Sequence, residues 1–245
     1  MEGNCRFCNR IFVKKYNKQK FCCLVCSNRY NLNNKTIVSL PNKYSSDLAE
    51  FFGILLGDGC VSKYFLKISL NSIADFKYIP LVTRLLKKLF RGASISLLKR
   101  RNQNMIEVQI SSKEVCDYIR KIGFESKTRY IPNWILKNSN FFIATIRGLF
   151  DTEGSVGIKY FNGKSGKYFY KQLTVTNKNK NILVFLQKYL EVLKYHPTNN
   201  SNKNIYISNS NDINRYLNEV VPHNPKLTKR LKIKRIGEFI YKKKI

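Results

Sequence analysis

The chain has 245 residues, of which 43% are hydrophobic and 13% aromatic, so it can bury a folded core and is not a disordered chain. Lys and Arg outnumber Asp and Glu by 45 to 15, and the net charge of +30 favours a polyanionic partner, with nucleic acid the leading class. The apolar runs are too short to span a membrane and the charged N-terminus shows no secretory signal. We therefore expect an intracellular protein, in a prokaryotic cytoplasm or an organelle, without a membrane partner.

The first 30 residues contain a cysteine pattern that is typical of a zinc site. Five of the seven cysteines lie in two short-spaced groups within residues 5–26. Two thiolates from each group complete a tetrahedron around Zn²⁺, and a segment this short cannot fold without an ion. We predict a zinc-ribbon-like segment over residues 1–30 with structural Zn²⁺. The expected ligands are Cys5, Cys8, Cys22 and Cys26, with Cys23 as an alternative to Cys22. The remaining two, Cys60 and Cys116, lie in apolar patterns and are expected to be core thiols.

Residues 31–45 are polar and are predicted to link this segment to the rest of the chain. Beyond them the chain divides by sequence into two related halves, 46–137 and 138–245, and the second ends in a basic tail. The relation is clearest where Leu48–Gly59 aligns with Ile143–Gly154 at an offset of 95 residues.

Small residues recur every four positions in both aligned segments, at 49, 53 and 57 and at 144, 148 and 152. On a helix these positions form one flat stripe, and two such stripes allow the helix backbones to pack unusually close. Glycine inside a helix costs roughly 0.5–1 kcal/mol relative to alanine, so its repeated use favours close packing. We predict two helices packed along these stripes, with Gly59 and Gly154 as their C-caps.

Parallel packing of the two helices brings Asp58 and Glu153 together at one end. Helix C-termini already carry partial negative charge, so two carboxylates there repel each other unless divalent cations bind them. In a strongly basic protein this constellation predicts Mg²⁺ bound by Asp58 and Glu153, and phosphodiester chemistry.

Alternation and helical periodicity predict a similar order of elements after each acidic helix. In the first half they are a strand or hairpin, a helix broken or kinked at Pro80, two strands and a helix: Cys60–Leu70, Ile73–Phe90, Ala93–Lys99, Met105–Ile110 and Lys113–Ile122. In the second half two strands flank a Gly-rich turn at 162–166, before a helix, a strand and a helix: Val156–Tyr160, Tyr168–Thr176, Asn181–Leu193, Ile205–Ser208 and Ile213–Val221. Each half is thus expected to offer about four strands. Trp134 is expected in the core or at the seam between the halves, and His196 and His223 offer no rival catalytic set.

The segments LAEFFGILLGDG and ATIRGLFDTEG strongly resemble the two signature helices of single-chain LAGLIDADG homing endonucleases. The resemblance implies an α+β fold of two αββαββα repeats, related by a pseudo-twofold axis, that form a saddle on double-stranded DNA, beside the small zinc ribbon. It implies a monomeric enzyme that makes a Mg²⁺-dependent double-strand break in a long recognition site, as in intron homing.

The resemblance also assigns roles near each cleavage site. Lys127 and Lys226 resemble the basic residue beside each scissile phosphate, with Lys229 competing with Lys226, and Asn71 and Asn177 resemble the polar residue that orders water. The strands of the saddle send one face to the core and the other to the major groove. The candidate groove-facing residues are Lys63, Lys67, Lys99, Arg100, Arg101, Lys159, Lys171 and Lys203.

Three other functions are compatible with the same fold. They are an intron-RNA maturase, a DNA-binding regulator that no longer cuts, and a free-standing remnant of an intein. Retention of both acids favours the nuclease over the regulator without excluding a second role on intron RNA. The sequence shows no splice-junction pattern with a terminal His-Asn, which disfavours the intein remnant.

Overall fold

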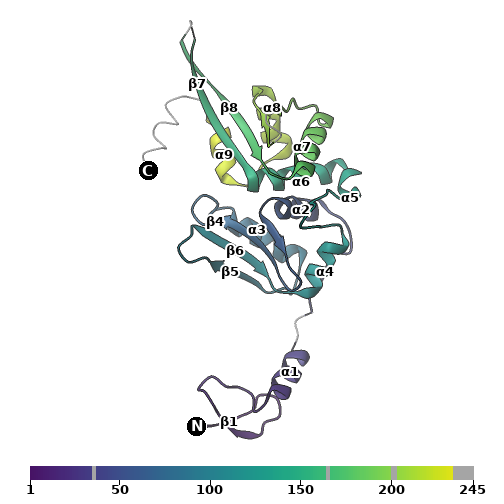
Figure 1. The fold of residues 1–245 in the computed structure, drawn as a ribbon, viewed down its shortest axis with the longest axis vertical. Coiled ribbons are helices and arrows are strands. Elements are labelled where there is room, and N and C mark those ends of the chain that lie inside the picture. The colour runs from purple at the N-terminus through teal and green to yellow at the C-terminus, as the bar shows by residue number, and fades with distance from the viewer. Residues whose placement is uncertain (35–36, 164–165, 200–202, 234–245) are drawn as a thin grey trace. The chain divides into compact units, whose positions relative to one another are not determined.

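A computed structural model describes residues 1–34, 37–163, 166–199 and 203–233, the side chains of 161–163 and 166–168 excepted. The chain divides into two compact units, Met1–Ile37 and Val38–Ile245 (Figure 1). The centre of the predicted Gly-rich turn and residues 234–245 of the predicted basic tail lie outside the described residues. Within the described ranges no helix is long and apolar enough to cross a membrane.

The smaller unit is centred on cysteines and not on an apolar core. It contains an antiparallel ribbon and one helix, β1 (Glu2–Asn4), β2 (Ile11–Val13) and α1 (Leu24–Asn33). Cys5 is fully buried, whereas α1 contributes no buried residue and Leu24 is 75% exposed. The helix continues past the predicted boundary at residue 30. Other residues of the predicted linker belong to the larger unit, where Ser39 pairs with Arg91.

The larger unit is built around two adjacent helices. They are α2 (Ser46–Asp58) and α6 (Ser139–Glu153). A Cβ atom added at Gly53 would stand 2.2 Å from the Thr145 carbonyl oxygen, and one added at Gly57 would stand 3.1 Å from Glu153 Cγ. The backbones therefore pack directly against each other, as the small-residue stripes predict. Because the contacts advance in the same direction along both helices, the helices are parallel and both end at the same place.

The first half of this unit adds a four-stranded antiparallel sheet with the order β3-β4-β6-β5. The strands are β3 (Gly59–Val61), β4 (Leu66–Asn71), β5 (Ile95–Lys99) and β6 (Met105–Ile110). The helices are α3 (Ile79–Leu89), α4 (Lys113–Lys121) and the short α5 (Asn133–Leu136). Leu66, Ile68 and Leu70 alternate inward along β4, so one face of the sheet packs on the helices and the other is available for a partner.

The second half has a three-stranded antiparallel sheet with the order β7-β8-β9. The strands are β7 (Gly154–Gly163), β8 (Gly166–Thr176) and β9 (Asn204–Ile207). The helices are α7 (Lys180–Val192), α8 (Ser210–Arg215), the π-helix η1 (Tyr216–Val220) and α9 (Pro225–Leu231). Figure 1 shows the two sheets on either side of the α2–α6 pair, each beginning directly after one of these helices. This arrangement confirms the predicted α+β fold of two related repeats.

Several elements differ from their predicted extents. The helix predicted from Ile73 begins at Ile79, because Pro80 occupies its first turn, where a missing N–H group costs no helical hydrogen bond. Among the described residues the second half has three strands, and an isolated bridge from Thr198 to Tyr206 takes the place of a fourth. The prediction that Cys60 is a core thiol is wrong, because its side chain lies on the exposed face of the edge strand β3; Cys116 is buried.

The seam between the repeats is extended by Trp134. Its ring packs edge-on against Phe52 of α2 and Phe141 of α6, and it stacks on Tyr44 with centroids 4.4 Å apart. Its Nε1 donates to the Ile122 carbonyl oxygen at 2.9 Å. The tryptophan therefore joins both repeats, which confirms its predicted place.

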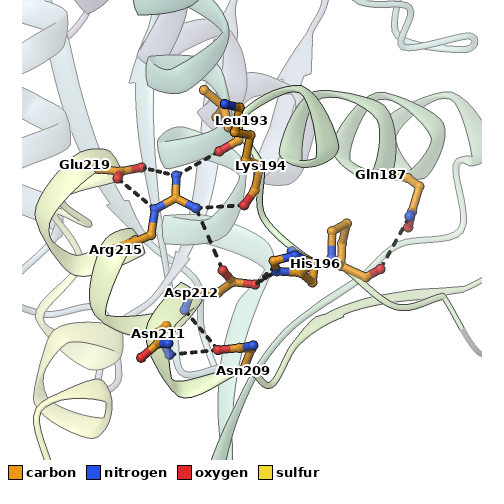
Figure 2. A network of polar contacts seen from close by, with 10 residues as sticks. Gln187, Leu193, Lys194, His196, Asn209, Asn211, Asp212, Arg215 and Glu219 are labelled. Carbon is orange, nitrogen blue, oxygen red and sulfur yellow. Dashed lines mark hydrogen bonds and ion pairs between the residues drawn. The ribbon is translucent and has the colours of Figure 1, made fainter.

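A polar network fixes α8 and η1 against the end of α7 (Figure 2). Arg215 donates to the carbonyl oxygens of Leu193 and Lys194 at 2.8 and 2.7 Å, and it pairs with Glu219 at 2.9 Å. The nearly buried Asp212 accepts from the backbone N–H and the ring Nδ1 of His196, at 2.8 and 3.0 Å. These contacts provide hydrogen-bond partners for backbone groups that the end of a helix leaves unpaired. The position of His196 is therefore explained by its structural role.

Candidate active site

Two carboxylates meet where α2 and α6 end. Asp58 and Glu153 are the last residues of the two helices, and the side chain of Glu153 lies against Gly57, next to Asp58. Burial raises the pKa of Asp58 to about 7, the negative charges of Glu153 and Asp75 add to the rise, and Lys226 and then Arg129 oppose it. Two acids in one half-buried place, where the charge of Glu153 disfavours the charge of Asp58, form a site that a divalent cation would stabilise.

Burial also raises the pKa of Glu153, and this rise is opposed first by Arg129 and then by Lys226. Glu153 lines an open pocket of about 530 Å³ at the end of the seam, which a phosphate group could enter. The other lining residues are Gly57, Arg129, Thr176, Asn177, Lys178 and Asn179. Both repeats therefore contribute to the walls of this pocket.

The two asparagines at the strand ends do not behave alike. Asn177 donates from Nδ2 to Glu153 Oε1 at 3.2 Å, so it lies beside the acid as the family resemblance implies. Asn71 follows the same pattern in sequence, but its Oδ1 accepts from the backbone N–H groups of Ile73 and Ala74 at 2.9 and 2.8 Å. In the first repeat this residue therefore closes a turn.

Arg129 is a site residue that the sequence interpretation missed. Its guanidinium donates to the carbonyl oxygens of Leu56, Gly57 and Gly59, at the end of α2. Its backbone is in the left-handed region, with φ of 50°, which redirects the side chain toward the seam. Lys127, the predicted basic residue of this segment, is exposed, and the cations that act on the two acids are Arg129 and Lys226.

Lys226 lies where it was predicted, near both acids. Its Nζ is 3.2 Å from Asp75 Oδ1, and its backbone N–H donates to Oδ1 of Asn224, the N-cap of α9. Lys229, the alternative, lies in the last turn of the same helix. The choice of Lys226 over Lys229 agrees with this placement.

His223 is partly exposed and contacts two buried acids beside the seam. Its Nδ1 is 2.6 Å from Glu50 Oε1, and the other oxygen of Glu50 accepts from Arg147 at 2.9 Å. The backbone N–H groups of His223 and Asn224 donate to the two oxygens of Asp151 at 2.9 and 3.0 Å. Glu50, Asp151 and His223 are close enough together to hold a metal ion, but hydrogen bonds already engage both oxygens of each carboxylate.

The predicted groove-facing cations divide between the two faces of the sheets. Lys67 lies on the outer face of β4 and pairs with Glu107 at 2.7 Å, and Arg100 pairs with the same carboxylate at 2.8 Å. Exposed side chains are those of Lys63, Lys99, Arg101, Lys159 and Lys203. Lys99 to Asn104, including Arg100 and Arg101, line a shallow pocket of about 440 Å³ at the turn between β5 and β6.

Two of these placements correct the prediction. Lys99 pairs in register with Ile106, which lies opposite the buried Leu70, so Lys99 is on the core face at the end of its strand. Lys171 pairs with Ile158 and donates from Nζ to the carbonyl oxygen of Leu231 in α9 at 2.6 Å. Neither side chain points from the outer face of its sheet.

The cysteine cluster of the smaller unit has the dimensions of a metal site. The Sγ atoms of Cys5, Cys8, Cys22 and Cys26 all lie within 4.8 Å of one another. Cys22 Sγ is 3.7 Å from Cys8 Sγ and 3.5 Å from Cys26 Sγ. Tetrahedral Zn–S bonds of about 2.3 Å place neighbouring sulfur atoms about 3.8 Å apart, so the four thiols fit a zinc ion. Cys23 is exposed and lies outside this set.

Comparison with known proteins identifies the fold. Residues 140–220 match the sequence model of the LAGLIDADG-like domain. Structures with the same fold include the homing endonuclease I-DmoI with DNA and Ca (TM-score 0.52, 20% identity, 76% of this chain and 97% of that one). Two others are the I-LtrWI LAGLIDADG homing endonuclease bound to target DNA (0.54, 13%, 81% and 91%) and the LAGLIDADG meganuclease I-AabMI bound to uncleaved DNA (0.55, 10%, 82% and 92%).

Relatives by sequence come from Methanocaldococcus jannaschii. They are an uncharacterized protein (29% identity, 61% of this chain and 55% of the relative) and the replication factor C small subunit (28% identity, 72% and 9%). The chain thus spans about half of the first relative and a small part of the second. Residues 140–220 are thus similar to a LAGLIDADG-like domain, and the larger unit of the chain has the saddle fold of the single-chain LAGLIDADG homing endonucleases.

Proposed function

We propose that the protein is a site-specific DNA endonuclease that makes a Mg²⁺-dependent double-strand break in a long recognition site. The observation that carries this proposal is the meeting of Asp58 and Glu153 at the ends of two parallel helices, between two sheets in a chain of net charge +30. Cations along the outer faces of the sheets would neutralise DNA phosphates, and the strands would read the major groove. DNA bound to similar folds agrees with this partner.

The donor set at the helix ends fits Mg²⁺. Asp58 and Glu153 offer hard carboxylate oxygens, and burial together with the neighbouring acids raises the pKa of Asp58, which a bound cation would offset. When bound there, Mg²⁺ would activate a water molecule and stabilise the departing 3′ oxygen. Asn177 would orient water at Glu153, while Lys226 and Arg129 would stabilise negative charge on the phosphates.

Replacement of either acid tests the activity directly. Asp58→Asn or Glu153→Gln removes a metal ligand and should abolish double-strand cutting, while DNA affinity stays within about tenfold because phosphate contacts are spread over the sheets. The substrate is a plasmid that carries the sequences flanking the coding region, joined without it. Cleavage is followed with Mg²⁺ and with EDTA, and binding is measured with Ca²⁺. Loss of binding together with cutting would assign the acids a structural role.

For the smaller unit we propose a structural zinc site formed by Cys5, Cys8, Cys22 and Cys26, which holds an additional DNA-binding segment. The basic residues around the cysteines supply the phosphate contacts. Cys22→Ser should lose zinc and unfold this unit, whereas Cys23→Ser should retain stoichiometric zinc, because Cys23 lies outside the cluster. Metal analysis of purified protein and far-UV circular dichroism measure both effects. Zinc loss in the Cys23 variant alone would reverse the assignment.

A further inference from the structure

A third carboxylate lies beside the two acids at the helix ends. Asp75, in the turn after β4, is only 6% exposed. Its Oδ2 accepts from the Asn71 backbone N–H at 3.1 Å, and its Oδ1 accepts from Asn224 Nδ2 at 2.9 Å and lies 3.2 Å from Lys226 Nζ. Asp75 therefore reaches from the first repeat to the cation-bearing segment of the second.

These contacts hold Lys226 at both ends. The ammonium group pairs with Asp75, and the backbone N–H donates to Asn224 Oδ1 at 2.9 Å. Asn224 is itself buried and donates from Nδ2 to the Asp151 carbonyl oxygen at 2.7 Å. A free lysine side chain samples many rotamers, so a fixed one meets a phosphate at a lower entropic cost.

The second repeat has an equivalent contact in the opposite direction. Asp75 follows Asn71 by four residues, and Asn181 follows Asn177 by four residues. Asn181 donates from Nδ2 to the carbonyl oxygen of Thr128 at 2.8 Å, and Asn179 donates to the same oxygen at 3.0 Å, so Asn181 is the nearer of two side chains that hold the residue before Arg129. In both repeats, the residue four positions after the strand-end asparagine thus extends its side chain across the seam. There it holds the segment that carries the cation of the other repeat.

The placement of the two cations follows the same crossed pairing. Arg129, from the first repeat, lines one pocket together with Glu153 of the second. Lys226, from the second repeat, pairs with Asp75 of the first, so each cation lies beside an acid of the opposite repeat.

We propose that Asp75 and Asn181 are positioning residues, each of which fixes the cation of one cleavage site across the seam: Lys226 for the Asp58 site and Arg129 for the Glu153 site. This inference rests on the proposed nuclease function. The holding group is an anion in direct contact with the cation in one site, and a neutral amide bound to the neighbouring backbone in the other. The two strands of the DNA therefore depend on different residues.

Strand-resolved cleavage tests the proposal. The two strands of the wild-type substrate are labelled separately, and single-turnover rates are measured on a denaturing gel. Asp75→Asn removes the ion pair and should slow the cutting of one strand by on the order of tenfold, with the other strand changed less than about twofold. Lys226→Met should slow the same strand, and the double variant should be no slower than Lys226→Met alone, because both changes disable one unit. Asn181→Ala should slow the opposite strand.

A purely structural role would give a different pattern. If Asp75→Asn slows both strands equally, or if it slows one strand and Asn181→Ala slows the same one, the inference is overturned while the nuclease function stands. Should Asp75→Asn fail to fold, Lys226→Met and Asn181→Ala must still affect opposite strands. Asp47→Asn, which breaks an exposed ion pair with Lys88, is the matched control and should change neither rate. If the wild-type protein cuts neither strand, the proposed function itself fails, and this inference with it.

Discussion

Asp58 and Glu153 occupy equivalent positions in the two repeats, yet their surroundings differ residue by residue. Asp58 has a second acid, Asp75, and Lys226 near it, whereas Glu153 has Asn177 and Arg129. The helix ends supply the common feature, two carboxylates on a glycine-lined seam. The turns that approach from the opposite repeat supply the differences, and with them two sites of unequal charge.

The pair of His223 and Glu50 makes stability depend on pH. The hydrogen bond to Glu50 raises the pKa of His223. Burial and the charge of Arg147 lower this pKa, and the charge of Asp151 raises it further. Because the pKa is higher in the folded state, the stabilisation is complete below the unfolded value near 6.5 and is lost as the pH rises through the folded value. The difference in melting temperature between the wild type and His223→Asn should therefore be largest near about pH 6 and shrink toward about pH 8.5. A difference that stays constant across this range would show that the pKa of His223 is the same in the folded and unfolded states.

Residue roles could be predicted from sequence where register alone determines them. The offset of 95 residues aligns Asp58 with Glu153, and parallel packing then brings them together. Arg129 could not be found this way, because a left-handed residue in an irregular segment turns its side chain toward the seam. Lys171 did carry a signal: it shares the alternation of the buried Leu173 and Val175, which places it on the core face.

At the scale of elements, the seam between α2 and α6 has no room for a side chain at its glycines. A Cβ at Gly53 would stand 2.2 Å from Thr145 O, and one at Gly148 would stand 2.2 Å from Glu50 O. Backbone atoms cannot move aside singly, so an added methyl group pushes the helices apart. The seam also sets the distance between the two acids, which couples helix packing to the chemistry.

Gly53→Ala should therefore destabilise the protein, although the same change stabilises an isolated helix by roughly 0.5–1 kcal/mol. We expect a net loss of about 2 kcal/mol or more in the free energy of unfolding, measured with urea, because overpacking outweighs propensity. Gly157→Ala is the control: its Cβ would lie 3.9 Å from Gln172 O, an ordinary contact, and the change should stay within about 0.5 kcal/mol. Equal effects of the two substitutions would mean that the helices are not tightly packed.

The boundaries of helices and strands could be predicted only where the side-chain pattern marks them. Met105–Ile110 alternates clearly and is strand β6 as predicted, whereas the helix expected from Ile73 begins at Ile79. Helical periodicity continues through residues 73–78, but Asp75 uses its carboxylate on the Asn71 backbone N–H and holds that stretch in turns. The contact that shortens the helix also brings Asp75 to the candidate active site. The local departure from helical periodicity therefore has a functional interpretation.

At the scale of the whole molecule, the charge of +30 makes DNA binding strongly dependent on salt. The contribution of each cation depends on which face of its sheet it occupies. Lys159 and Lys171 lie on the same hairpin but on opposite faces: Lys159 pairs with Tyr170 and is exposed, whereas Lys171 pairs with Ile158 and donates to Leu231 O. They form a matched pair for testing which face meets DNA.

Lys159→Ala should reduce the slope of log affinity against log salt by about 0.9, the value for one lost phosphate contact on duplex DNA. Lys171→Ala should leave that slope unchanged and instead lower the free energy of unfolding by about 1 kcal/mol, because it removes a hydrogen bond to the end of α9. Both slopes are measured by titrating the labelled substrate at several salt concentrations, with Ca²⁺ in place of Mg²⁺ so that the DNA stays intact. If Lys171→Ala lowers the slope as much as Lys159→Ala, the DNA does not follow the outer face of this sheet, and the saddle must bind its duplex in another orientation.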